Sequence, residues 1–307
     1  MKIVSVINYK GGVGKTTITA NLAASLAAQG KNVLVVDLDP QANLTFSFIG
    51  IDEWKNEYKD KTIKNIFESF IQRANMPKLS SLLLTPYPVN DCFKTGGEIQ
   101  LLSSHLSLVN IDLELAINLG GGTSKQQRDN FLSVYSILKN SILDFLKESK
   151  KEYDIVLIDC PPNLNIVTKN AIVASDYYII PAKPDYLSTL GIQELKLHIN
   201  SLMEEYNENA EKSEGKYSKI YPQLAGVVFN MVSIRNGKPI EAQNYYVETV
   251  QDLEIPVFET FISIGNTAYA SAPEQGIPVC VNKAIDKKYV NELNYFMLEF
   301  AEKVGME

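Results

Sequence analysis

The first forty residues of the chain restrict its fold more than any other segment. A short apolar run rich in β-branched residues covers residues 3–7, and a break with three glycines follows at residues 8–14. Apolar side chains at positions 18, 22 and 26 then recur at helical spacing until Gly30, and a second apolar run covers residues 32–37. The continuous hydrophobicity of the second run is typical of a parallel strand that is covered on both faces. The chain therefore opens with a strand, a loop, a helix and another strand.

The remaining sequence repeats this alternation. Further β-rich runs cover residues 99–102, 153–159, 177–181 and 224–230. Helical patterns cover residues 131–149, 165–175 and 188–206. Strands that alternate with helices predict an α/β fold with a doubly wound, mostly parallel sheet flanked by helices. We see no linker and no internal repeat, so we expect one domain over residues 1–307.

Three stretches depart from this pattern because they lack apolar periodicity. They lie near residues 52–61, 120–129 and 207–219, and we expect them to be surface insertions. The second of them begins with three consecutive glycines, which favour a flexible loop over a second phosphate site.

Composition excludes several classes of protein. The chain has 307 residues, of which 45% are hydrophobic and 21% charged, as in an ordinary globular protein. No stretch approaches 18 consecutive apolar residues and the N-terminus lacks the pattern of a secretory signal, so we expect a cytoplasmic protein that binds no membrane. The three cysteines are too far apart for a metal or redox pair. The net charge of −7 argues against general wrapping by nucleic acid but is compatible with one local basic face.

The break after the first strand has the residues of a phosphate-binding loop. It reads Lys10-Gly11-Gly12-Val13-Gly14-Lys15-Thr16-Thr17. Glycines let successive backbone N–H groups turn toward a phosphate, and a helix that starts near Lys15 directs its positive end to the same place. Lys15 would bridge the β- and γ-phosphates, and Thr16 would give its hydroxyl to Mg²⁺. The alternative is a glycine-rich turn without function, which the Lys-Thr pair and the flanking strand and helix disfavour.

This loop resembles the deviant Walker A motif of the ParA/MinD family of P-loop ATPases, in which an extra lysine stands at the position of Lys10. Other blocks match the family in order: residues 37–43 (DLDPQAN), 99–108 (IQLLSSHLSL), 154–162 (DIVLIDCPP) and 227–230 (VVFN). The similarity runs from residue 1 to about residue 282, with the three insertions as gaps. It implies a P-loop NTPase fold with ATP and Mg²⁺ as cofactors.

The resemblance also implies a role for individual residues. Lys10, Lys15 and Asp39 would be catalytic, with Lys10 reaching the nucleotide of a partner subunit and Asp39 orienting the attacking water. The nucleotide would contact Lys10, Gly11, Gly12, Val13, Gly14, Lys15, Thr16, Thr17 and Asn230, the last of these near the adenine. Thr16, Asp37 and Asp159 would surround the metal. The absence of the guanine-binding [NT]-K-x-D loop at residues 229–232 predicts ATP rather than GTP.

Each of these roles has a simpler alternative. Lys10 would otherwise be a solvated loop lysine, and Asp159 a strand-end residue that caps the next turn. Asp37 and Asp39 would otherwise be solvated acids in a turn that ends at Pro40.

Several branches of the family are disfavoured by missing residues. The chain has no C-x-x-C pair, as iron–sulfur carriers would require, and we expect Cys160 to be a small buried residue. The last segment, residues 290–303, has an apolar stripe, but acidic residues on its polar face would be repelled by anionic lipid. We therefore expect this helix to pack on the sheet.

The remaining branch is that of the DNA-partitioning proteins. By resemblance, an ATP-bound homodimer would bind nonspecific DNA at the nucleoid, and a ParB-like partner would stimulate hydrolysis. The arginine pair often found in the family is absent, so a DNA surface would consist of Lys283, Lys287 and Lys288, or of Arg235 with Lys238. Two alternatives stay open: an ATP-driven positioning or regulatory switch that acts through protein partners without DNA, and a nucleotide-binding scaffold that never hydrolyses ATP.

Overall fold

An eight-stranded sheet forms the centre of the molecule in the computed structural model, which describes residues 1–94, 96–120 and 123–306. The strand order is β10-β7-β6-β1-β5-β2-β4-β3, and every neighbouring pair is parallel except β4 with β3. The strands are β1 (Lys2–Val6), β2 (Asn32–Asp37), β3 (Leu83–Leu84), β4 (Glu98–Leu102), β5 (Ile155–Asp159), β6 (Tyr177–Ala182), β7 (Gln223–Val232) and β10 (Ile262–Ser263). A separate hairpin consists of β8 (Ile234–Arg235) and β9 (Lys238–Pro239).

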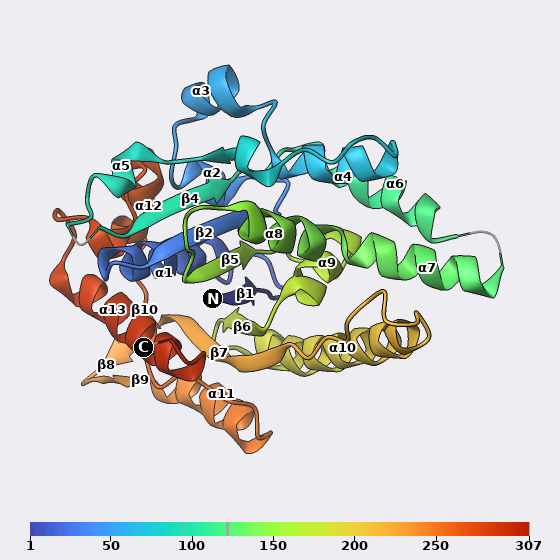
Figure 1. Cartoon of the computed structure of the whole chain (residues 1–307). Helices are drawn as coiled ribbons and strands as arrows, with labels where there is room; N and C mark the ends of the chain where they lie inside the picture. The colour runs from blue at the N-terminus through green and yellow to red at the C-terminus, as the bar shows by residue number, and fades with distance from the viewer. Residues whose placement is uncertain (95, 121–122, 307) are drawn as a thin grey trace.

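Helices cover both faces of the sheet, as two separate hydrophobic clusters show. One face carries α1 (Lys15–Ala28), α2 (Asn43–Phe46), the 3₁₀ turn η3 (Val279–Val281) and α13 (Lys287–Lys303). The other carries α4 (Ile63–Ile71), α6 (Leu108–Leu119), α7 (Ser124–Tyr135), α8 (Ile137–Glu148), α9 (Ile166–Ala174), α10 (Tyr186–Glu211) and α11 (Glu241–Asp252). The remaining elements are α3 (Ile51–Glu53), the π-helical turn η1 (Trp54–Tyr58), the 3₁₀ turn η2 (Leu79–Ser81), α5 (Tyr87–Asn90) and α12 (Asn266–Gln275). In Figure 1, α1 and α13 lie to the left of the view, while α7 and α10 extend to the right.

This architecture confirms the predicted α/β class with a mostly parallel sheet flanked by helices. All six predicted strands are present, as β1, β2, β4, β5, β6 and β7. The strands that sequence reasoning missed, β3, β8, β9 and β10, have only two residues each. Two residues are too few to produce an alternating pattern, so pairing with a neighbour decides these strands.

The predicted helices needed larger corrections. The helix expected over residues 131–149 is two helices, α7 and α8, with a break at Ser136. The stretch near 120–129, expected to be a surface insertion, is helical from Ser124 onward, because Thr123 and Gln126 form a capping box. Gly121 and Gly122 lie outside the described residues.

The other two expected insertions also contain regular structure. Residues 52–61 include most of α3 and all of η1, and most of these residues are exposed. Residues 207–219 begin with the last turn of α10, where Ala210 is buried, and continue as turns and loop. Polar composition hid these helical segments, because only one narrow side of each contacts the core.

The C-terminal helix packs against the domain core as predicted. Leu293, Phe296, Met297 and Phe300 of α13 are buried, and α13 contacts α1, η3 and β10. Cys160 is fully buried, again as predicted. No helix in the described part of the chain is long and apolar enough to cross a membrane.

The register of the parallel strands brings the predicted site residues to one edge of the sheet. Val6 at the end of β1 pairs with Asp159, and Asp37 at the end of β2 also pairs with Asp159. In the sheet, β5 and β2 lie on one side of β1, and β6 and β7 lie on the other side. The direction in which strands are added to the sheet therefore reverses at β1. Ligands of open α/β sheets bind outside the carboxyl ends of the strands at such a reversal. We call this the carboxyl edge.

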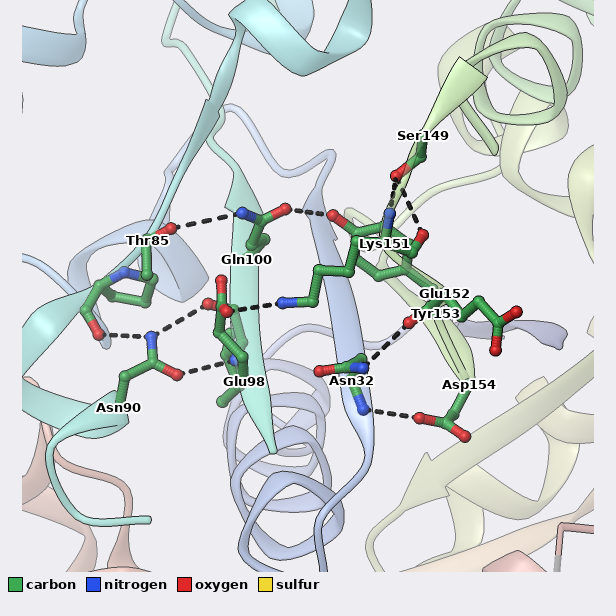
Figure 2. Close-up of polar contacts among 12 residues, drawn as sticks. Asn32, Thr85, Asn90, Glu98, Gln100, Ser149, Lys151, Glu152, Tyr153 and Asp154 are labelled. Atoms are coloured by element: carbon green, nitrogen blue, oxygen red, sulfur yellow. Dashed lines mark hydrogen bonds and ion pairs between the residues drawn. The ribbon is translucent and has the colours of Figure 1, made fainter. Parts of the chain in front are cut away.

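The opposite edge, here the amino edge, is held by paired polar groups at the starts of β2, β4 and β5. Figure 2 shows the side chain of Lys151 reaching across to Glu98, with a 2.7 Å ion pair. It also shows the Asn32 backbone N–H donating to the Asp154 carboxylate at 2.7 Å. An ion pair and a backbone hydrogen bond thus connect the strands at this edge.

Candidate functional site

The loop between β1 and α1 adopts a conformation that needs glycine. Gly12 and Gly14 have φ angles of 68° and 89°, in the left-handed region that disfavours a side chain. A Cβ atom on Gly14 would also lie 1.9 Å from the Asn230 side-chain nitrogen. Gly14 stands immediately before α1, so the turn delivers the chain directly into the helix N-terminus. This geometry places backbone N–H groups and the positive end of α1 around one point.

Polar side chains brace the loop from both sides. Asn8 donates to the carbonyl of Pro181 at 2.7 Å and accepts from the backbone N–H of Lys10 at 2.9 Å. Asn230 donates to the carbonyl of Val13 at 3.0 Å and accepts from the Met231 backbone N–H at 2.8 Å. The loop shape is therefore fixed by neighbours at the ends of β6 and β7. The predicted contact between Asn230 and the adenine stays a prediction.

Lys15 lies folded over the loop. It is only 7% exposed, and its ammonium donates to the carbonyl of Lys10 at 3.2 Å. Burial lowers the pKa of Lys15, while the carboxylates of Asp159 and Asp39 oppose this shift. A buried cation with one carbonyl partner is well placed to bind a phosphate.

Asp159 accepts hydrogen bonds from two hydroxyl groups of α1. Thr16 donates to one carboxylate oxygen at 2.7 Å. The Thr19 hydroxyl is shared between the other oxygen at 3.1 Å and the carbonyl of Lys15 at 2.9 Å. Asp159 is almost completely buried, and burial raises its pKa to about 7 despite the Thr16 hydrogen bond and the nearby Lys15 charge.

Asp37 and Asp39 lie next to one another at the end of β2, but their surroundings differ. Asp37 is fully buried and accepts from both the backbone N–H and the hydroxyl of Thr45, at 2.9 and 2.7 Å. Burial, followed by the charge of Asp159, raises its pKa to about 8. Asp39 is 9% exposed, and its Oδ1 accepts from the backbone N–H of Gln41 at 2.9 Å.

Lys10 points away from Lys15 and contacts the start of α10. Its ammonium donates to both oxygens of Asp185, at 2.9 and 2.8 Å, and to the Ser188 hydroxyl at 3.4 Å. Burial would raise the pKa of Asp185, but the hydrogen bonds from Lys10 and Ser188 outweigh it and hold that pKa below its usual value. Lys10 is therefore held within its own chain here.

These residues fit a nucleotide and a magnesium ion. The donors for phosphate are the glycine loop, the N-terminus of α1 and the buried Lys15, with Thr16 at the end of the loop. Mg²⁺ prefers hard oxygen ligands and is usually held by one or two protein groups plus phosphate and water. Thr16 and Asp159 supply such oxygens, and two buried carboxylates with raised pKa values favour a nearby cation. Within the described residues, no group of three His, Cys, Asp or Glu side chains forms a separate metal cluster.

A family model described as "AAA domain" matches residues 1–212, which include every predicted site residue except Asn230. The chain is also 28% identical over 284 residues to the sporulation initiation inhibitor protein Soj of Bacillus subtilis, covering 91% of this chain and 90% of that protein. It is 28% identical to the chromosome-partitioning ATPase Soj of Treponema pallidum, covering 89% and 87%.

The chain belongs to the ParA/MinD family of P-loop ATPases.

Solved structures of other proteins share the fold of this ParA/MinD family member. An ATP complex of a McdA variant from Cyanothece aligns with a TM-score of 0.69 and 19% identity, covering all of this chain and 97% of that one. A cobyrinic acid a,c-diamide synthase from Mycobacterium smegmatis with ADP and magnesium aligns with a TM-score of 0.66 and 23% identity, covering 99% and 96%. At these identities the likeness establishes the fold alone.

Sequence reasoning missed several residues that shape this site. Five of them hydrogen-bond to predicted site residues or to the loop backbone: Asn8, Thr19, Thr45, Ser104 and Asp185. A partial signal was available, because Asn8 and Ser104 are polar residues that closely follow apolar strands. Thr19, Thr45 and Asp185 are indistinguishable in the sequence from ordinary helix and capping residues.

Proposed function

We propose that this protein is a Mg²⁺-dependent ATPase that forms an ATP-sandwiched homodimer and partitions or positions a cargo. The observation that carries the proposal is the cluster of Lys15, Thr16, Asp39 and Asp159 around the glycine loop at the carboxyl edge. We further propose that the whole chain acts as one ATPase domain in the cytoplasm. The partitioning ATPase Soj supports this reading, because it matches over most of both chains.

The arrangement gives each residue a defined task. Lys15 and the loop amides would neutralise the phosphates. Thr16 and Asp159 would hold the metal, which would supply charge neutralisation at the transferred phosphoryl group. Asp37 is fully buried opposite Asp159, and a cation bound nearby would favour its ionised form. Asp39 is the least buried of the three acids, and no described residue donates a hydrogen bond to its Oδ2. That oxygen orients the attacking water.

Lys10 supplies the contact between subunits. Its side chain is 33% exposed and belongs to the loop itself. A partner subunit that covers the loop would therefore bring the partner's nucleotide close to the Lys10 ammonium. Release from Asp185 frees the ammonium for the partner's phosphates. ATP thereby links two subunits, and hydrolysis separates them.

A DNA surface is best placed on the β8–β9 hairpin. Arg235 and Lys238 are paired in register across this hairpin, and neither forms an ion pair with a described residue. Like charges opposite one another destabilise a strand pair, so folding alone does not explain them. In the other candidate cluster, Lys288 is already paired with Glu292 at 4.0 Å. Two hairpins brought together in a dimer would bind DNA more tightly than either alone, and would bring the ATP-bound form to the nucleoid.

A second candidate function, a switch that acts through protein partners without DNA, is favoured by one surface. Four large apolar residues follow one side of α6 and the turn before it, and each is between 57% and 78% exposed: Leu106, Val109, Leu113 and Ile117. Contiguous exposed apolar residues are typical of protein interaction sites. The same surface is compatible with a ParB-like partner that stimulates the weak basal hydrolysis.

A gel shift with nonspecific DNA, with and without ATP, separates these functions. We expect a salt-sensitive shift that requires ATP and that weakens in the Arg235→Gln/Lys238→Gln variant. Lys147→Gln/Lys150→Gln removes the same charge near the amino edge and serves as the control. Absence of any ATP-dependent shift leaves the protein-partner switch. Absence of phosphate release in the presence of ATP and Mg²⁺ would instead indicate a scaffold that never hydrolyses ATP.

A further inference from the structure

The loop that follows β4 contacts the predicted catalytic acid from a distant part of the chain. β4 is parallel to β2 with Leu102 opposite Val36, so the residues after β4 arrive beside the residues after β2. Ser103 and Ser104 are the first of these, and both are completely buried. Buried hydroxyls require partners, and their partners differ.

Ser104 connects to both acids of the DLDPQAN segment. Its hydroxyl donates to the Asp39 backbone carbonyl at 2.6 Å. Its backbone N–H donates to the Thr45 hydroxyl at 3.1 Å, and that hydroxyl in turn donates to Asp37 at 2.7 Å. A single residue after β4 therefore fixes the main chain at Asp39 and the side chain that holds Asp37.

Ser103 faces elsewhere. Its hydroxyl donates to the carbonyl of Lys61 at 3.4 Å, and its carbonyl accepts from the backbone N–H of Ile63 at the start of α4. Ser103 thus anchors α4 and contacts neither acid, which makes it a matched control with the same residue type, the same burial and an adjacent position.

We propose that Ser104 is a positioning residue for hydrolysis, which acts by holding the Asp39 backbone so that its carboxylate faces the γ-phosphate side of the loop. The inference rests on the proposed function, because it takes Asp39 as the residue that orients water. The Asp39 carboxylate has only one short-range restraint of its own among the described residues, the Gln41 backbone N–H. The Asp39 backbone carbonyl accepts two hydrogen bonds, one from the Ser104 hydroxyl and one from the Ala42 backbone N–H at 2.8 Å. Loss of the Ser104 bond therefore loosens the acid without touching the phosphate loop.

The test compares Ser104→Ala with Ser103→Ala in the full-length chain. In Ser104→Ala we expect phosphate release at saturating ATP to fall about tenfold, the loss that corresponds to one buried hydrogen bond, with affinity for a fluorescent ATP analogue unchanged within about twofold. Ser103→Ala should leave turnover unchanged. Equal losses in the two variants, or a loss of ATP affinity in Ser104→Ala, would overturn the proposal.

A second readout needs no nucleotide. The backbone amides of Asp39 and of residues 41–45 should exchange hydrogen faster in Ser104→Ala than in the parent chain, and Ser103→Ala should not change them. Unchanged exchange in Ser104→Ala contradicts the proposal. Should the alanine variant fail to fold, Ser104→Cys retains a weak donor of similar size, and intermediate turnover is then expected.

Asp39→Ala separates this inference from the proposed function. We expect this variant to lose turnover, and Ser104→Ala added to it should lower the residual rate no further, because both act at one point. Full turnover in Asp39→Ala would refute the proposed role of Asp39 itself. Loss in Asp39→Ala without loss in Ser104→Ala would refute only the positioning role of Ser104.

Discussion

The two edges of the sheet use polar groups in opposite ways. At the amino edge, Glu98 forms an ion pair with Lys151, and the Asp154 carboxylate accepts a hydrogen bond from a backbone N–H. At the carboxyl edge, Asp37 and Asp159 are both buried, and each has a pKa raised toward neutrality. The first arrangement stabilises the fold, whereas the second leaves an unfavourable electrostatic potential that a cation can relieve.

The difference shows where folding and function conflict. A buried carboxylate with a raised pKa destabilises the folded chain once it ionises, so the carboxyl edge is less stable than the fold alone would require. At the amino edge, made from the same strands, the charge of Glu98 is paired with that of Lys151. Mutations at the two edges should therefore separate activity from stability.

The largest expected difference concerns one lysine at each edge. Lys15→Met should lower ATP hydrolysis by about 1000-fold, because it removes a buried cation from the phosphates. Lys151→Met should leave hydrolysis unchanged within about twofold, because its ammonium contacts only Glu98 and the ring of Tyr153 among the described residues. Phosphate release under saturating ATP and Mg²⁺ measures both. A comparable loss in the two variants would erase the functional distinction between the edges.

The pH dependence of stability should reveal the carboxyl edge in the nucleotide-free protein. The folded pKa values of Asp37 (about 8) and Asp159 (about 7) lie above their ordinary value, so the folded chain binds more protons than the unfolded chain. The contribution of these groups to stability is then highest at low pH and falls as the pH rises toward 8, by an amount on the order of 3–6 kcal/mol between about pH 5 and about pH 8.

Thermal unfolding across this pH range measures the slope. ATP with Mg²⁺ should flatten it, because the cation favours the ionised carboxylates, and Asp37→Asn should reduce it. A slope that Asp37→Asn leaves unaltered would show that other groups produce it.

At the amino edge, the loss of a single acceptor should affect stability without affecting activity. Asp154→Ala leaves the Asn32 N–H without its 2.7 Å partner, and we expect a cost of about 1–2 kcal/mol in the free energy of unfolding. Urea denaturation measures the cost, and ATP affinity should not change. Asp144→Ala, which removes an exposed acid from α8, is the control and should cost less than about 0.5 kcal/mol.

The smallest effect is expected at Lys10. Asp185→Asn removes the ion pair to Lys10 but keeps a good N-cap for α10. Because the pair is about one-third exposed, release of Lys10 should strengthen the ATP-dependent dimer only about threefold. Sedimentation with a non-hydrolysable ATP analogue measures this shift. Weaker dimerisation in Asp185→Asn would mean that Asp185 assists the dimer rather than competing with it.

The fold was largely predictable because its strongest signals are local. Six strands could be predicted from apolar runs, and the glycine loop marked the first crossover. The helices were less predictable, because α7 is mostly polar and its start depends on a capping box at Thr123. Two-residue strands such as β3 and β10 leave no pattern at all.

The sequence suggested candidate residues for the site but not their contacts. The glycine loop with Lys15 and Thr16 indicated phosphate chemistry, whereas the roles of Asp37, Asp39 and Asp159 came from the family resemblance. Strand register then pairs Asp37 with Asp159 at the carboxyl edge. The partners of Lys10 and Asn230 could not be predicted, since Asp185 and Val13 are 175 and 217 residues away from them along the chain.

The sequence by itself determined the class of fold, the phosphate loop and the acids that follow the strands, because each depends on residues that are neighbours in the chain. Only the folded chain shows which of those groups are buried, which are paired and which are carboxylates whose pKa is raised by burial. Burial and pairing depend on strand order and register, and these join segments such as Ser104 and Asp39 that no local pattern connects.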